Sequence, residues 1–212
     1  GCNPCSEIIL RPYQFCNLSE VVIRADDTEE TLLEKVEMAT ILGTFQSTLT
    51  NFKYLRKIWK DNTEEERLLG VSLTGIMDNK LFNDHNTMVF EDGQQVFDGL
   101  RVGGILTRLK EKAIETNKKL SEELGIPQST AITCVKPSGT VSQLVDSASG
   151  IHARHSKYYI RTVRGDNKDP LTQFMIDSGI PNEPDVMKPN STTVFSFPMK
   201  SPEGATTRND MS

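Results

Sequence analysis

The sequence predicts an α/β fold, in which short strands alternate with longer amphipathic helices. Long segments carry apolar residues at helical spacing together with alternating Lys and Glu. Short β-branched runs, bounded by Gly or Pro, lie between those segments. A chain of 212 residues is long enough to bury one α/β core.

Composition and charge exclude several classes of protein. The net charge is −5, from 24 basic and 29 acidic residues that are interspersed, so no basic stripe is present for a nucleic-acid polymer. No apolar run approaches the roughly 20 residues of a membrane-spanning helix. Four Cys and no signal-peptide pattern predict a cytoplasmic protein with free or catalytic thiols. The chain begins at Gly1 without an initiator Met, which indicates processing or a fragment.

The first half of the chain predicts an extended loop, a short strand at 21–23 and helices. A helix begins at Asp27 or Thr28, because either side chain can cap it. A second helical stripe follows at 45–59, either separate from the first helix or continuous with it. Two further segments follow, a strand or buried segment and then a polar loop: 70–77 and 82–94.

The second half predicts a long helix over 96–124, which ends at Gly125 and Pro127. The elements expected after it are strands at 131–135, 158–163 and 192–197, a tight loop at 136–140 and a helix after Asp169-Pro170. We expect residues 1–200 to form one domain. Residues 201–212 have almost no apolar content and predict a mobile loop or a truncated end.

Three functional side chains near the start of the chain alternate with other residues. Asn3, Cys5 and Glu7 would project to one face of an extended backbone, and Pro4 favours that backbone. An amide, a thiol and a carboxylate together provide a hydrogen-bond donor, a redox-capable or radical-capable sulfur and a general base. A surface turn with a buried Cys is the alternative interpretation.

Two other arrangements of the cysteines are less favoured. Cys2 and Cys5 form a C-x-x-C pair, but no strand precedes it as in thioredoxin-like redox motifs. A zinc site built from this pair with His152 and His155 would need two halves far apart in the sequence, whereas zinc modules are compact. We therefore predict no metal site.

Residues 136–142 (KPSGTVS) follow an apolar run and precede more apolar residues. Backbone N–H groups at such a strand-to-helix junction favour an anion such as phosphate. The segment is not a Walker A motif, because no Gly-Lys-Ser/Thr follows a first Gly at the required spacing. An ordinary turn is the alternative interpretation.

Five segments together resemble the large subunits of ribonucleotide reductases, and more closely the adenosylcobalamin-dependent branch. They occur in the family's order over about the first 165 residues: Asn3–Ile8, Phe15–Val21, Gly70–Gly75, Cys134–Ser142 and Ser156–Arg161. The resemblance implies the C-terminal part of a ten-stranded α/β barrel, with the active-site finger loop, residues 1–20, at the N-terminus.

The resemblance also implies roles for four residues at the start of the chain. Cys5 would carry a transient thiyl radical that abstracts the 3′ hydrogen of the ribose. Glu7 would take the 3′-hydroxyl proton, and Asn3 would hydrogen-bond the sugar. Cys16 would be one of two cysteines that deliver reducing equivalents to the 2′ carbon and end as a disulfide.

The resemblance extends to the loop at 136–142, which would hold the substrate phosphates through backbone N–H groups. The matching residues are Pro137, Ser138, Gly139, Thr140 and Val141. Cys2 and Cys134 match no functional cysteine of the family, so both are interpreted as structural.

The resulting hypothesis is a fragment of a ribonucleotide reductase, which makes 2′-deoxyribonucleotides from ribonucleoside triphosphates, or diphosphates, for DNA synthesis. The implied cofactor is adenosylcobalamin, on the likeness of residues 156–164, and the implied reductant is an external dithiol such as thioredoxin. The missing upstream and downstream parts of the enzyme are expected partners. Without them, unpaired strand edges should leave the chain inactive and poorly stable.

Two alternatives remain open at this point. A di-iron-dependent ribonucleoside-diphosphate reductase would use a similar catalytic loop, but the interval of eleven residues between Cys5 and Cys16 argues against it. A nonenzymatic nucleotide-binding module would use residues 138–140 for phosphate and keep the cysteines as structural residues.

Overall fold

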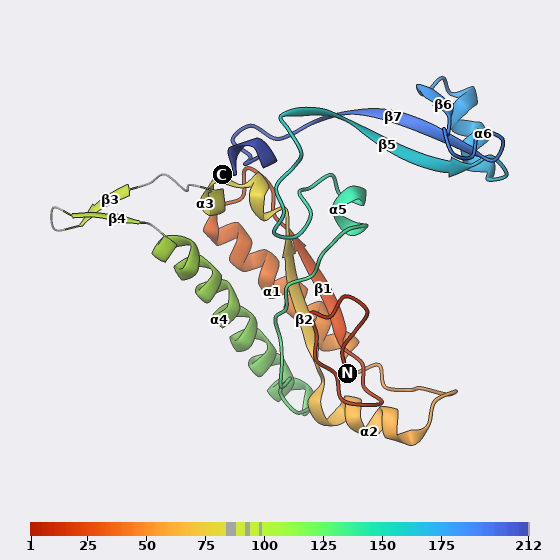
Figure 1. The fold of residues 1–212 in the computed structure, drawn as a ribbon. Coiled ribbons are helices and arrows are strands. Elements are labelled where there is room, and N and C mark those ends of the chain that lie inside the picture. Colours follow the sequence, from red (N-terminus) through yellow and green to blue (C-terminus); the bar gives the residue numbers. More distant parts are fainter. Residues whose placement is uncertain (84–87, 92–93, 98, 212) are drawn as a thin grey trace. The chain divides into compact units, whose positions relative to one another are not determined.

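The computed structural model describes residues 1–83, 88–91, 94–97 and 99–211 (Figure 1). The chain divides into two compact units, which are described separately. The first unit comprises Gly1–Arg154 and Glu203–Thr206, and the second comprises His155–Pro202 and the residues after Thr206. The boundary between Arg154 and His155 lies inside the range 1–200 that the sequence predicted as one domain.

The first unit is built on a parallel pair of strands. β1 (Asn17–Val22) pairs with β2 (Leu69–Thr74), and the helices α1 (Glu29–Gln46) and α2 (Lys57–Glu66) lie in the connection between them. The strand expected near 21–23 and the strand expected in 70–77 are thus confirmed. The strand expected at 131–135 forms only in part: the segment has one bridge to β2, between Thr133 and Val71, and backbone hydrogen bonds join residues 131–134 to Leu69 and Val71.

The sequence predicted the start of α1 correctly and the course of the chain after it incorrectly. Thr28 is the N-cap: its hydroxyl accepts a hydrogen bond from the Thr31 backbone N–H at 3.4 Å, and the Thr31 hydroxyl accepts one from the Thr28 N–H at 3.0 Å. The helix expected over 45–59 does not form. Instead, the Ser47 and Thr48 hydroxyls donate to backbone carbonyls at 2.6 and 2.7 Å, which competes with helix continuation.

One apolar core joins the two strands to α1 and to α4 (Gly99–Leu124). Ile105, Leu109 and Ala113 are buried and confirm part of the apolar stripe predicted for the long helix. The buried apolar residues of this core are Val21, Ile23, Leu32, Val36, Ala39, Leu69, Val71, Phe82, Ile105, Leu109, Ala113 and Ile132. The core therefore occupies one face of the β1–β2 pair, and the opposite face is left for other residues.

Short elements connect β2 to α4. They are a 3-10 turn, η1 (Ile76–Asp78), the helix α3 (Lys80–Asn83) and an antiparallel pair, β3 (Met88–Glu91) with β4 (Gln94–Phe97). The polar loop predicted for 82–94 is wrong where the structure describes it, because 82–83 belong to α3 and 88–91 to β3; residues 84–87 and 92–93 lie outside the described residues. No helix in the described ranges is long and apolar enough to span a membrane.

The second unit is an antiparallel sheet with one helix. β5 (Tyr158–Asp166) pairs with β7 (Thr192–Lys200), which also pairs with β6 (Asn182–Pro184). α6 (Pro170–Asp177) begins after Asp169, whose carboxylate accepts from the Leu171 N–H at 2.9 Å. The two strands and the helix predicted for this region are confirmed. The expected tail is partly structured, because a 3-10 turn, η2 (Arg208–Asp210), lies within it.

A buried polar side chain fastens the two long helices of the first unit to each other. Asn117 of α4 is fully buried. Its Nδ2 donates to the Thr44 hydroxyl of α1 at 2.9 Å and to the Ser129 hydroxyl at 3.1 Å, and its Oδ1 accepts from the Ser129 N–H at 3.0 Å. Within a stretch rich in Lys and Glu the sequence gives no sign that this Asn is buried.

Replacing Asn117 by Ala should lower the free energy of unfolding by about 2 kcal/mol, because the Ser129 N–H is left buried without an acceptor. Urea unfolding followed by circular dichroism measures this loss. The exposed neighbour Lys118 provides the control, because Lys118→Ala should change the value by less than about 0.5 kcal/mol. Equal midpoints for the two variants would contradict the structural role of Asn117.

Candidate active site

The first ten residues form a tight hairpin. Gly1 and Leu10 exchange backbone hydrogen bonds of 2.8 and 3.0 Å, and the Ser6 N–H donates to the Asn3 carbonyl at 2.9 Å. Pro4 therefore occupies the second position of a four-residue turn, where its fixed φ is favoured. The extended backbone predicted for residues 3–7 is wrong, because Pro4 serves the turn and Ser6 adopts a left-handed conformation with φ of 62°.

The turn nevertheless brings Asn3 and Glu7 into contact, as the sequence predicted by a different route. The Asn3 Nδ2 donates to the Glu7 Oε1 at 2.5 Å, and the Asn3 Oδ1 accepts from the Ile8 N–H at 3.2 Å. Cys5 lies at the turn and its side chain is exposed. The amide and the carboxylate are thus held together beside an accessible thiol.

A lysine that sequence reasoning did not single out completes this cluster. The Lys136 Nζ donates to the Glu7 Oε1 at 2.6 Å. Burial raises the pKa of Glu7, but the hydrogen bonds from Lys136, the backbone and Asn3 outweigh burial and hold that pKa below its usual value. The other carboxylate oxygen, Oε2, is buried and has no hydrogen-bond partner among the described residues.

The face of the β1–β2 pair that points away from the apolar core carries the next part of the site. Side chains alternate along a strand, so Gly70 and Ser72 of β2 face opposite to the core residues Leu69 and Val71. The Glu20 position of β1 lies beside Ser72 in the parallel register. The Ser72 hydroxyl accepts from the Lys136 N–H at 3.0 Å, which links this face to the Glu7 cluster.

Gly70 makes room for two sulfur atoms on this face. A Cβ at residue 70 would lie 3.1 Å from the Cys134 Sγ, 3.3 Å from the Cys16 Sγ and 2.5 Å from a Leu18 methyl carbon. The two thiols therefore gather over the one residue that has no side chain. The sequence interpretation of Cys134 as a structural residue did not anticipate this position beside Cys16.

Both of these thiols are half-buried and free. Burial raises the pKa of Cys16 to about 12 and the pKa of Cys134 to about 11, and neighbouring acidic groups add to the shift. Both groups consequently remain protonated at neutral pH. All four cysteines are free, and the described residues include no group of three or more His, Cys, Asp and Glu side chains placed to hold a metal ion.

The loop at 136–142 presents unpaired polar groups. None of the backbone N–H groups of residues 138–141 donates a hydrogen bond within the described chain. The Ser138 hydroxyl is also buried without a partner there. Pro137 has no N–H, so it cannot contribute in the way its neighbours can. A short helix of four residues, α5 (Val141–Leu144), follows the loop.

The segment after α5 supports this loop from behind. The Ser149 hydroxyl donates to the Pro137 carbonyl at 2.8 Å. Gly150, with φ of 55°, lies so close that an added Cβ would be 2.8 Å from the Lys136 carbonyl oxygen. A side chain at residue 150 would therefore displace the start of the loop, and only Gly satisfies both the backbone conformation and the close approach.

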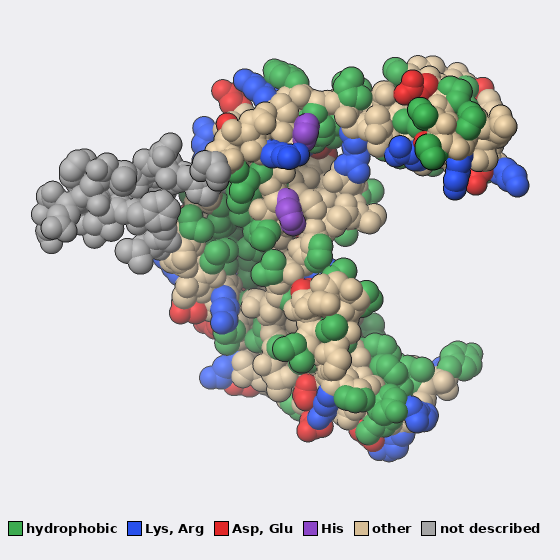
Figure 2. All heavy atoms as spheres, in the orientation of Figure 1, with side chains coloured by type: hydrophobic (Ala, Val, Ile, Leu, Met, Phe, Trp, Pro, Cys, Tyr) green, Lys and Arg blue, Asp and Glu red, His purple; other side chains and the backbone are tan. Residues whose placement is uncertain are grey.

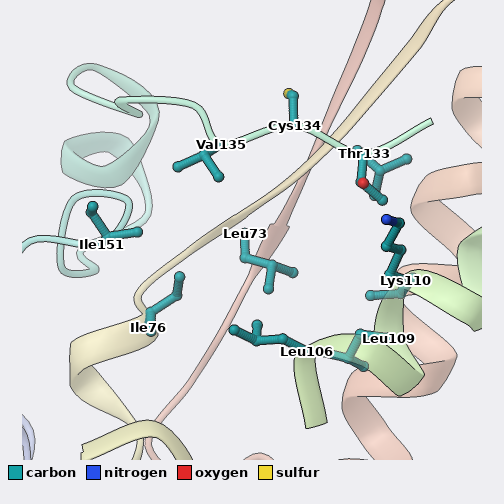
Figure 3. A pocket seen from close by; sticks show the side chains of 11 residues that line it. Leu73, Ile76, Leu106, Leu109, Lys110, Thr133, Cys134, Val135 and Ile151 are labelled. Atoms are coloured by element: carbon teal, nitrogen blue, oxygen red, sulfur yellow. The ribbon is translucent and has the colours of Figure 1, made fainter. Parts of the chain in front are cut away.

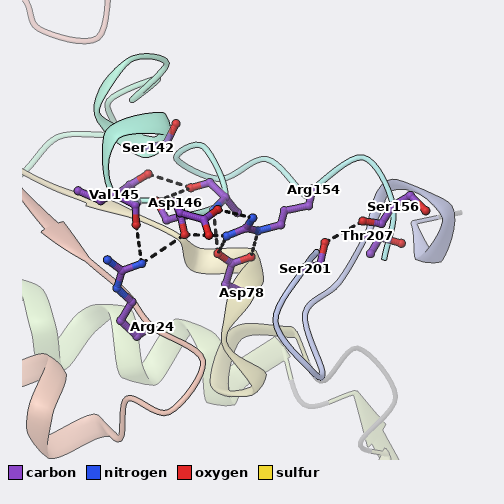
Figure 4. Close-up of polar contacts among 12 residues, drawn as sticks. Arg24, Asp78, Ser142, Val145, Asp146, Arg154, Ser156, Ser201 and Thr207 are labelled. Atoms are coloured by element: carbon purple, nitrogen blue, oxygen red, sulfur yellow. Dashed lines mark hydrogen bonds and ion pairs between the residues drawn. The ribbon is translucent and has the colours of Figure 1, made fainter. Parts of the chain in front are cut away.

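The buried Arg154 side chain links that supporting segment to η1, the turn that follows β2 (Figure 4). The buried Arg154 guanidinium forms ion pairs of 2.9 Å with Asp78 and with Asp146. Asp78 also accepts from the Ala148 N–H at 2.8 Å, and Arg24 donates to the Val145 carbonyl at 2.6 Å. Burial lowers the pKa of Arg154, but the two carboxylates outweigh burial and raise that pKa.

The two buried thiols should be slow to alkylate, because alkylation requires the thiolate. At pH 8, iodoacetamide should label Cys16 and Cys134 at least about tenfold more slowly than the exposed Cys2 and Cys5. Peptide mass spectrometry of timed samples measures the four rates. In urea the four rates should converge, and equal rates in the folded protein would contradict the protected thiol pair.

Comparison with known proteins shows what the chain is similar to. It is 32% identical over 212 residues to the adenosylcobalamin-dependent ribonucleoside-triphosphate reductase of Lactobacillus acidophilus, and 29% identical over 211 residues to that of Lactobacillus leichmannii. Each match covers 94% of this chain and 28% of the relative. The chain thus spans little more than a quarter of the length of these curated relatives. No protein-family model matches it.

Solved structures give the same result. A B12-dependent (class II) ribonucleotide reductase matches 98% of this chain and 30% of its own, with a TM-score of 0.75 and 28% identity. The class Id ribonucleotide reductase alpha subunit of Actinobacillus ureae matches 84% of this chain and 35% of its own with a TM-score of 0.56, and at 18% identity it supports the fold alone. By sequence and by structure, the chain is similar to a segment of adenosylcobalamin-dependent (class II) ribonucleotide reductases.

Proposed function

We propose that this chain is the part of an adenosylcobalamin-dependent ribonucleotide reductase that carries the radical cysteine and the phosphate-binding loop. One observation carries the proposal. Lys136, the first residue of the loop at 136–142, contacts Glu7 of the Asn3-to-Glu7 turn at 2.6 Å, so the turn and the loop form a single site. A nucleotide whose phosphates occupy the loop would present its sugar to the turn.

The first chemical step is hydrogen abstraction by Cys5. The thiyl sulfur forms an S–H bond as the C3′–H bond of the ribose breaks, and the unpaired electron passes to C3′. The Glu7 Oε2, buried and without a partner, accepts the 3′-hydroxyl proton. Adenosylcobalamin, when bound, supplies the one-electron oxidation that turns the Cys5 thiol into the thiyl. The exposure of Cys5 fits access by such a cofactor, and no described residue is assigned as its ligand.

The second step is reduction at C2′. Cys16, a protonated thiol on the same sheet face, and a second cysteine from another part of the enzyme together supply two electrons and two protons. The 2′-hydroxyl leaves as water, a hydrogen takes its place, and the two thiols become a disulfide. The hydrogen on Cys5 then returns to C3′, which restores the thiyl, and Glu7 returns the proton to the 3′ oxygen. An external dithiol of the thioredoxin type returns that disulfide to two thiols for the next turnover.

The loop at 136–142 supplies the phosphate site of this proposal. Four consecutive unpaired N–H groups, at residues 138–141, and the buried Ser138 hydroxyl offer five donors to one anion. The matched relatives are ribonucleoside-triphosphate reductases by name. We therefore propose a ribonucleoside triphosphate as the substrate, with the diphosphate as the competing choice.

The remaining barrel strands and the other redox cysteine would come from other parts of the same enzyme. An apolar cavity of about 350 Å³ lies between α1, α4 and the end of β2 (Figure 3), lined by residues such as Leu73, Ile76 and Leu106. Val135 lines it while remaining 63% exposed, at a segment that pairs with β2 through one bridge. Apolar side chains also remain exposed elsewhere in the first unit (Figure 2), among them Leu49 and Tyr54. This exposed surface supports a ten-stranded barrel completed by further β/α units.

Cys5→Ser in the complete polypeptide that carries this segment should abolish ribonucleotide reduction and leave nucleotide binding intact, because a hydroxyl does not form a comparable radical. Deoxyribonucleotide formation and equilibrium binding of a ribonucleoside triphosphate measure the two properties. Cys2→Ser is the matched control and should retain activity, since Cys2 is exposed and three residues away. Unchanged activity in Cys5→Ser would favour a nonenzymatic nucleotide-binding module.

Ser138→Gly should weaken nucleotide binding by about tenfold, because the variant loses one hydrogen bond to a charged group. The backbone of residue 138 has φ of 53°, which Gly adopts without strain, so the loop should keep its shape. Isothermal titration with the nucleotide measures the dissociation constant. Ser178→Gly, at an exposed position in the second unit, is the control. Equal affinity in both variants would argue against phosphate at this loop.

A further inference from the structure

We propose that Lys136 is a positioning residue for Glu7: it engages one carboxylate oxygen and thereby leaves the other one, Oε2, for the substrate's proton. The inference rests on the proposed function, in which Glu7 is the base. It assigns a role to a residue that otherwise only precedes the phosphate loop.

The two oxygens of Glu7 have different surroundings. Oε1 accepts from the Lys136 ammonium at 2.6 Å and from the Asn3 amide at 2.5 Å. Oε2 is buried and accepts no hydrogen bond from the described residues. The Glu7 side chain is 7% exposed, and a carboxylate so placed requires a cation or several donors to stay ionised. Oε1 therefore accepts both side-chain hydrogen bonds, and Oε2 accepts none from the described residues.

Lys136 is itself held in place. Its side chain is 22% exposed, and its backbone N–H donates to the Ser72 hydroxyl of β2 at 3.0 Å. Gly150 packs against its carbonyl oxygen. The Lys136 backbone is thus held by β2 and by the supporting segment. A flexible surface lysine would lack these two contacts.

The other groups around this pair leave Lys136 as its only cation within the described chain. Cys5 lies on the turn of Glu7, Cys16 precedes β1, Glu20 lies in β1 and Cys134 precedes the loop, and each interacts electrostatically with Lys136 or with Glu7. Burial raises the pKa of Glu20, and Lys136 partly offsets that effect. With both buried thiols protonated as well, none of these neighbours replaces the positive charge.

The consequence for pH dependence has a definite sign. With Lys136 present, the pKa of Glu7 lies below its usual value, so the ionised base persists as the pH falls. Without Lys136, its hydrogen bond and its charge no longer lower the pKa of Glu7, while burial still raises it, so this pKa should be higher than in the wild type. Activity that requires ionised Glu7 should then be lost at a higher pH than in the wild type.

The experiment uses the complete polypeptide that carries this segment, with kcat/KM measured between pH 5 and 9. Lys136→Met should shift the acidic limb of the pH profile of kcat/KM to higher pH by about one unit or more. It should also lower kcat at least about tenfold at pH 6. The dissociation constant of a ribonucleoside triphosphate should change by less than about threefold. Lys136→Arg should restore the wild-type limb because it keeps the charge. Lys57→Met, at an exposed lysine of α2, is the control.

The outcomes separate the two proposals. If the wild type does not reduce ribonucleotides, the proposed function fails, and the role of Lys136 fails with it. If the wild type is active but Lys136→Met keeps the wild-type limb, or loses nucleotide affinity in place of shifting the limb, the positioning role is overturned and the function stands. Should Lys136→Met not fold, Lys136→Gln carries the test, with the same upward shift expected.

Discussion

The parallel pairing of β1 with β2 is the constraint on which the site depends. This register sets Glu20 beside Ser72 and brings Cys16, just before β1, next to Gly70. The register also determines which face of the strand pair packs against the apolar core, because Val21, Leu69 and Val71 point to the helices. A shift of one residue in either strand would exchange the two faces and move the cysteine into the apolar core. The parallel register of β1 and β2 therefore determines which side chains can meet at the candidate site.

The candidate site contains two kinds of titratable group in different protonation states: the thiols of Cys16 and Cys134 are protonated, and the Glu7 carboxyl is ionised. Burial without a charged partner holds the thiols of Cys16 and Cys134 protonated. Glu7 stays ionised in spite of burial, because hydrogen bonds from Lys136, the backbone and Asn3 lower its pKa. The difference does not come from depth alone, since all three side chains are withdrawn from solvent. It comes from the location of one ammonium group, which reaches the carboxylate and pairs with neither sulfur.

The sequence predicted several elements correctly from local signals, although the helical stripe at 45–59 and the extended backbone at 3–7 were wrong. The cap at Thr28, the Pro170 that starts α6 and the apolar stripe of α4 are all encoded within a few neighbouring residues. Contacts between distant segments were missed. Asn117 and Ser129 are twelve residues apart, and Lys136 and Glu7 are 129 apart. Nothing in the local sequence of either pair reports its partner.

The residues 3–7 show how a correct outcome followed from an incorrect geometry. Alternation in an extended chain predicted that Asn3 and Glu7 converge, whereas a turn at Pro4 and Cys5 brings them together. The resemblance to ribonucleotide reductases predicted roles for these residues without describing their backbone. Family likeness and local physical chemistry thus supplied different parts of the answer, since one named the side chains and the other explains their contact.

The ion pairs of Arg154 have a mechanical consequence. Arg154 is the last residue of the first unit's main segment, and both of its ion pairs are made to aspartates of that same unit. The chain is therefore anchored immediately before it enters the second unit. A pull on the chain from His155 onward would load the buried ion pair with Asp78 and the more exposed one with Asp146 before it reached Ser149 and Gly150, which contact the loop at 136–142. In the sequence, the ion-paired Arg154 therefore separates the second unit from Ser149 and Gly150, which contact the loop at 136–142.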